Sequence, residues 1–101
     1  MEIIDSEDFD LTPAIKTAIE EKAEKIYEVI GHEQKLEVFL SKEGKSETKV
    51  VFRTNYLGKT ISAEVIGPDF YHLVNEAKAK FIRQIKDLKE KNIDRHHGKE
   101  L

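Results

Sequence analysis

Basic side chains recur between Asp69 and Lys91, and they give this sequence its clearest capacity for chemistry. The cations of this segment are Lys78, Lys80, Arg83, Lys86, Lys89 and Lys91. In a helix, which turns by about 100° per residue, Arg83 and Lys86 point away from an apolar stripe and the other four lie on its shoulders. Such an array can reach successive phosphates of a nucleic acid. Exposed lysine-rich helices also occur simply as soluble surfaces, so the spacing alone leaves both interpretations open.

A second group of possible polyanion contacts lies on predicted strands. In the run TKVVFRTNY, Lys49, Val51 and Arg53 alternate with residues that face a core, and Phe39 and Lys59 join them from the neighbouring runs. Basic and aromatic side chains on one sheet face suit contact with RNA. An ordinary solvated sheet face with tolerated apolar residues is the alternative, and the sequence leaves it open.

Residue arrangements typical of catalytic or metal sites are nearly missing. There is no cysteine, and no glycine-rich phosphate loop follows a predicted strand. The histidines are His32, His72, His96 and His97, and none has the spacing of a metal-binding motif. The pair His96-His97 falls in a predicted tail, which gives it no fixed geometry for a metal. We therefore expect no catalytic residue, no metal, no cofactor and no small-molecule substrate. The protein is predicted to act by binding a partner and not as an enzyme.

Length and composition predict one domain that folds without disulfide bonds. The chain has 101 residues, of which 39% are hydrophobic and 37% charged, so it is neither disordered nor fibrous in composition. The absence of cysteine fits a reducing compartment. No apolar run approaches the roughly 20 residues of a membrane span, and the acidic start MEIIDSEDFD is unlike a signal peptide. These features predict a cytoplasmic protein that does not associate with membranes.

Charge is unevenly divided along the chain. Residues 1–34 carry a net charge of −7 and residues 35–101 a net charge of +4, within the overall −3. Such asymmetry hints at a polyanion-binding face on one side of the molecule. The alternative is that this charge only keeps a small domain soluble.

Hydrophobic periodicity and cap residues predict six elements. Thr12 is placed as an N-cap, Pro13 as the first helical residue and Gly31 as the end of that helix. Asp69 is placed as the N-cap of a second helix, after Gly67-Pro68. The predicted elements are a strand within 2–9, a helix over 13–30, strands over 35–41, 48–56 and 59–66, and a helix that runs to about 92.

This order, β-α-β-β-β-α, predicts an α+β fold with a four-stranded sheet. Each helix has a single apolar stripe, so both are expected to pack side by side on one face of the sheet and to leave the other face open. One domain is expected over residues 1–92, followed by a short flexible tail over 93–101.

The second helix resembles the signature of the ribosome hibernation promoting factor and ribosome-associated inhibitor family, also called the sigma-54 modulation protein family. The matching residues are Asp69-Phe70-Tyr71, Leu73-Val74, Lys80-Phe81-Ile82-Arg83-Gln84-Ile85, Lys86 and Lys89. The preceding Ile61-Ser62-Ala63-Glu64 and Gly67 fit as well, and LTPAIKTAIEEKAEKI resembles the family's opening helix. The resemblance covers essentially the whole chain and is strongest from Ile61 to Lys89.

The resemblance implies a fold like that of double-stranded-RNA-binding domains and a partner, the small ribosomal subunit. Family members bind its ribosomal RNA in the channel for messenger and transfer RNA, and they silence translation in stressed or stationary-phase bacteria. The RNA-binding role is carried onto Lys80, Arg83, Lys86 and Lys89, while Lys78 is added from helix geometry alone. A monomer off the ribosome is expected, because the second, dimerising domain of long members is missing.

The sequence departs from the family pattern at two places. The first strand usually holds a glycine and a basic or amide residue, whereas Asp5, Ser6, Glu7 and Asp8 stand here, so no RNA contact is carried onto it. Asp87 stands where a basic residue is usual. The alternative function is a regulatory protein–protein module of the sigma-factor modulation type, which would use the acidic first third and bind no ribosomal RNA.

Overall fold

The computed structural model describes the backbone of residues 1–6 and 9–100 and the side chains as far as Lys91. Its elements follow the predicted order, β-α-β-β-β-α. They are β1 (Glu2–Asp5), α1 (Pro13–Ile30), β2 (Leu36–Glu43), β3 (Glu47–Tyr56), β4 (Lys59–Gly67) and α2 (Phe70–Glu100). The α+β fold class predicted from the sequence is confirmed.

Helix α1 begins and ends at the predicted caps. The Thr12 hydroxyl accepts a hydrogen bond from the Ile15 N–H at 3.2 Å, and Pro13 occupies the first helical position, where no backbone N–H is needed. Gly31 closes the helix with φ of +96° and donates its N–H to the Tyr27 carbonyl. Glycine is favoured here because the left-handed region penalises any residue with a Cβ.

The sheet has the strand order β1-β2-β3-β4, with β1 parallel to β2 and the other pairs antiparallel. The parallel pair is joined through α1, whereas β2, β3 and β4 follow one another as a meander. The register aligns Val38, Phe52 and Ala63 across three strands, and all three are buried. Side chains alternate along a strand, so their sequence neighbours point to the opposite face.

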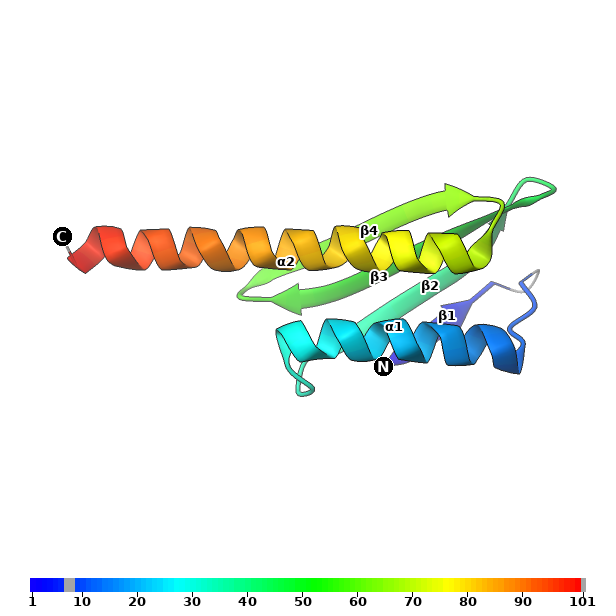
Figure 1. The fold of residues 1–101 in the computed structure, drawn as a ribbon, viewed down its shortest axis with the longest axis horizontal. Helices are drawn as coiled ribbons and strands as arrows, with labels where there is room; N and C mark the ends of the chain where they lie inside the picture. Colours follow the sequence, from blue (N-terminus) through cyan, green and yellow to red (C-terminus); the bar gives the residue numbers. More distant parts are fainter. Residues whose placement is uncertain (7–8, 101) are drawn as a thin grey trace.

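Both helices cover one face of the sheet, and the other face is open (Figure 1). Phe52 of β3 and Phe81 of α2 are fully buried, with ring centroids 6.2 Å apart in a tilted arrangement. The inward side of α2 also buries Leu73, Val74, Ala77 and Ile85. The core therefore lies between the helix layer and the sheet.

The N-cap of α2 is also as predicted. The Asp69 carboxylate accepts a hydrogen bond from the Tyr71 N–H at 3.2 Å, and its carbonyl accepts one from the Leu73 N–H at 2.9 Å. A negative side chain at this end also complements the helix dipole. These contacts fix the start of α2 at Phe70.

Two element ends differ from the prediction by more than two residues, whereas the ends of β2, β3 and β4 differ by two or fewer. Strand β1 stops at Asp5; the Phe9 N–H donates to the Ser6 carbonyl at 3.0 Å, and Phe9 enters the core near Phe70. Helix α2 continues to Glu100, beyond the expected end near Asn92, since no proline interrupts the segment. The flexibility of residues 93–101 stays a prediction, and so does their separation from the domain over 1–92.

Replacing Phe81 by alanine tests this core. The variant Phe81→Ala is expected to lose about 3–5 kcal/mol of unfolding free energy, because it leaves a cavity beside Phe52. Urea unfolding followed by circular dichroism measures the loss. As a control, Ile66→Ala removes a side chain that is 48% exposed, and it should change stability by less than about 0.5 kcal/mol. Equal losses in the two variants would contradict the described packing.

Candidate nucleic-acid interface

The outer face of α2 presents basic side chains to solvent. Lys80, Arg83 and Lys86 are exposed, and Lys78 is half-buried on the shoulder of the helix. We call these four residues the cationic face. Among the side chains that the structure describes, none of the ion pairs involves a member of this face. Their charges are therefore available to an anion from outside the protein.

A shallow groove runs along this face. Its lining includes Arg83, Lys86, Asp87 and Glu90, and its volume is about 460 Å³. Asp87, which stands where the family usually has a basic residue, therefore shares a surface with Arg83 and Lys86. Its carboxylate lowers the local positive potential, although it forms no ion pair with either cation in the described part of the chain.

Lys89 turns toward the protein. Its Nζ donates a hydrogen bond to the Val29 carbonyl at 2.8 Å and lies 5.9 Å from the centre of the Tyr56 ring. Val29 belongs to the last turn of α1, where unpaired carbonyls and the helix dipole favour a cation. Of the residues predicted to bind RNA from α2, Lys89 is thus the least available to a polyanion.

The predicted contacts on the open sheet face are paired with acids. Lys49 Nζ lies 3.4 Å from the Glu64 carboxylate on β4 and 3.5 Å from the Glu43 carboxylate on β2. The hydrogen bond to Glu64 and the negative charges of Glu64 and Glu43 raise the pKa of Lys49 above its ordinary value. The Lys49 charge is largely matched within the protein.

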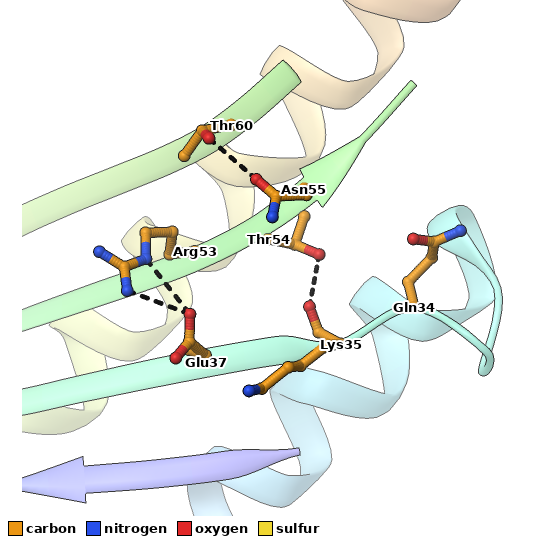
Figure 2. A pocket seen from close by; sticks show the side chains of 7 residues that line it. All are labelled: Gln34, Lys35, Glu37, Arg53, Thr54, Asn55 and Thr60. Carbon is orange, nitrogen blue, oxygen red and sulfur yellow. Dashed lines mark hydrogen bonds and ion pairs between the residues drawn. The ribbon is translucent and has the colours of Figure 1, made fainter. Parts of the chain in front are cut away.

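Arg53 is held in a similar way. Its Nη2 and Nε donate to the same Glu37 oxygen at 3.1 and 3.3 Å (Figure 2). Its guanidinium also lies over the Phe39 ring, 4.6 Å from the ring centroid. The sheet face therefore does not continue the unpaired positive charge of α2.

A polar hollow of about 330 Å³ lies beside Arg53, at the end of the sheet (Figure 2). The Thr54 hydroxyl donates to the Lys35 carbonyl, and Thr60 donates to Asn55 at 2.8 Å. These hydroxyls are engaged in structural hydrogen bonds, and none of them has a base positioned to activate it. The hollow is lined by Gln34, Lys35, Glu37, Arg53, Thr54, Asn55 and Thr60.

The histidines form no metal site within the described side chains, where no group of three potential ligands comes together. His32 lies 3.0 Å from Glu24, and His72 lies 3.9 Å from Glu76. The pair His96-His97 lies outside the described side chains, as do the acids Glu7 and Asp8 of the first segment. No helix in the described part of the chain combines the length and apolarity that a membrane span requires.

Sequence reasoning missed one exposed aromatic residue near the cationic face. Tyr71 is 57% exposed and borders a groove of about 610 Å³ between the start of α2 and the first half of α1. Lys22 of α1 also lines this groove. The spacing of Tyr71, Asn75 and Lys78, which is four and then three residues, places them on one side of α2 and could have revealed this surface.

These observations define a class of protein: a small α+β module with two helices on one sheet face and unpaired cations along its last helix. The model of the sigma 54 modulation protein / S30EA ribosomal protein family matches residues 3–93. The chain therefore belongs to this family, as its resemblance to the ribosome hibernation factors predicted. No curated protein matches the sequence.

Solved structures show the same fold. The N-terminal domain of Protein Y from Thermus thermophilus matches with a TM-score of 0.70 and 21% identity, over 86% of this chain and 94% of that domain. A ribosomal subunit interface protein from Coxiella burnetii matches with a TM-score of 0.72 and 22% identity, over 89% of this chain and 99% of the other. At such identities the likeness establishes the shared fold.

The pairing of Lys49 can be tested through its titration. In the folded protein the pKa of Lys49 lies above 10.5, so its contribution to stability is present below that value and is lost as the pH rises through the folded pKa. The variant Glu64→Gln should lower the pKa of Lys49, as measured by NMR of its side chain. Glu47→Gln, which removes an acid outside this ion pair, should leave the pKa raised. A Lys49 pKa unaffected by Glu64→Gln would contradict the pairing.

Proposed function

We propose that this protein binds ribosomal RNA of the small ribosomal subunit through the cationic face of α2 and thereby silences translation. The observation that carries the proposal is that Arg83 and Lys86 are exposed and unpaired among the described side chains. Membership of a family described as ribosomal protein and sigma modulator supports this partner. The relative from Coxiella burnetii is titled a ribosomal subunit interface protein, which supports it further.

The mechanism is occupancy and requires no bond to form or break. Cations along a helix face release counterions from RNA phosphates as they bind, which drives association and makes it sensitive to salt. A domain of this size, bound in the channel for messenger and transfer RNA, excludes both ligands by volume. One monomer in the cytoplasm is sufficient to exclude these ligands, because the whole cationic face lies on α2 of a single chain.

The distribution of charge favours one orientation. The cationic face looks outward from the helix layer, whereas the sheet cations Lys49 and Arg53 are neutralised by Glu64, Glu43 and Glu37. We therefore place α2 against the RNA and the open sheet face away from it. In this orientation the acids of β1 and the sheet also avoid the phosphates, which like charge would otherwise repel.

Charge reversal on α2 tests the proposal. Wild-type protein should cosediment with small subunits in a sucrose gradient at low salt, and the variant Arg83→Glu/Lys86→Glu should remain at the top. Two phosphate contacts would be lost and replaced by repulsion, so the affinity is expected to fall by at least about 100-fold. Addition of the wild type, but not of the variant, should inhibit protein synthesis in a cell-free system.

The matched control is Lys42→Glu/Lys45→Glu, which reverses two exposed charges at the hairpin between β2 and β3. This hairpin lies at the end of the sheet away from the free end of α2 (Figure 1). The control variant should still cosediment. Wild-type protein that remains at the top of a low-salt gradient would refute ribosome binding.

Salt dependence gives a second test. The four residues of the cationic face should by themselves contribute about −3 to the slope of log affinity against log salt concentration. Removing one charge, as in Lys80→Gln, should reduce the slope by about 1. In contrast, Lys89→Gln should change the slope little, because Lys89 is engaged with α1. A slope near zero for the wild type would exclude phosphate contacts as the basis of binding.

The alternative function is a regulatory protein–protein module, which the family description and the acidic first third of the chain favour. In that case a pull-down with the tagged protein should recover a sigma factor and no ribosomal RNA, and nuclease treatment should not change the result. Charge reversal at Arg83 and Lys86 should then leave recovery unaffected. Recovery of ribosomal RNA that depends on these two residues favours the proposed function.

A further inference from the structure

The turn between β3 and β4 contains an apolar residue in a strained and exposed position. Leu57 has φ of +51° and is 49% exposed. It is the only residue other than glycine with a positive φ in the described part of the chain. Left-handed backbone is costly for a side chain as large as leucine, and such outliers persist where they serve a function.

The turn gives no structural reason for leucine. Tyr56 pairs with Lys59, so Leu57 and Gly58 form a two-residue hairpin loop in which both φ angles are positive. This is the backbone of a type I′ turn, whose first position favours asparagine or aspartate. Leu57 is also absent from the apolar residues that pack on the core in the described structure, whereas its neighbour Tyr56 is among them. Leucine therefore stabilises neither the turn nor the core.

The hairpin tip lies beside basic residues of α2. Lys59, which follows the turn, lines a groove of about 260 Å³ together with Asp87 and Lys91. Asp87 also lines the groove that contains Arg83 and Lys86. The surface is thus continuous from the cationic face across α2 to the hairpin, and Figure 1 shows the β3–β4 turn alongside the second half of α2.

We propose that Leu57 is an apolar contact residue that inserts against unpaired bases of the RNA gripped by the cationic face. Unpaired RNA bases expose apolar faces that phosphate-binding lysines cannot use, and apolar side chains at a protein surface can wedge against bases. Lys59 and Lys91 flank the tip and hold the adjoining phosphates. This inference rests on the proposed function, and it adds a residue that contributes affinity without charge.

The variant Leu57→Asn distinguishes a loss of RNA affinity from a loss of folding stability. Asparagine suits the left-handed position, so the melting temperature should rise by about 4 °C. The affinity for small subunits should fall by about fivefold or more, because the buried leucine contact is lost. The slope of affinity against salt should stay unchanged, whereas Lys59→Gln should reduce it by about 1. A variant that is more stable and yet binds more weakly cannot be explained by damage to the fold.

Ile66→Asn is the matched control, since Ile66 is exposed to a nearly equal degree, 48%, but lies near the far end of β4 on the open sheet face. It should leave the affinity unchanged. If Leu57→Asn lowers the melting temperature, or if it binds as tightly as the wild type, the inference is wrong while the proposed function stands. If the wild type itself fails to bind, the proposed function is wrong.

Crosslinking identifies what Leu57 touches. A diazirine analogue of leucine placed at position 57 should, on irradiation of the bound complex, join the protein to ribosomal RNA. A crosslink to a ribosomal protein would overturn the assignment to RNA, and so would the absence of any crosslink from a complex that forms normally. The same analogue at position 66 should give no crosslink to RNA.

Discussion

The segregation of α2 into a buried side and a basic side is the constraint on which the rest of the molecule depends. Phe81 and Ile85 are fully buried against the sheet, and a helix that fixes these residues inward must turn Arg83 and Lys86 outward. The same hydrophobic contact therefore stabilises the fold and orients the charges. Because burial of aromatic and aliphatic side chains is worth far more than exposed ion pairs, the core determines where the cations lie.

Acidic partners make the charge of the open sheet face different from that of α2. Positive charge occurs on the sheet as well as on α2, but Glu37 holds Arg53, and Glu43 and Glu64 hold Lys49. Exposed pairs such as these add little stability. Their consequence is electrostatic: they match the charges of the sheet cations Lys49 and Arg53, whereas the cationic face of α2 keeps its positive charge unpaired among the described side chains. A protein with cations free on both faces would lack a preferred orientation on RNA.

Lys89 shows that a basic residue within a family motif can have a structural role. Its ammonium group donates to the Val29 carbonyl in the last turn of α1, and it thereby ties the end of α1 to α2. Leu57 presents the opposite case, an apolar residue that the fold does not require at a strained turn. Together they indicate that side-chain chemistry alone does not separate structural from functional residues. The two residues differ in their contacts within the fold: Lys89 bonds to the Val29 carbonyl, whereas Leu57 is not among the described residues that pack on the core.

The element order, both helix N-caps and the alternation of inward and outward residues along β3 followed from local patterns, because caps and periodicity involve residues only a few positions apart. The outward direction of Arg83 and Lys86 could be predicted for the same reason. The partners of Lys49, Arg53 and Lys89 could not be predicted from local patterns. Their partners are distant in sequence, 60 residues away for Lys89 and 16 for Arg53, and long side chains reach whichever acid or carbonyl the tertiary packing brings near. Tertiary structure alone therefore decided which of the cations stay free.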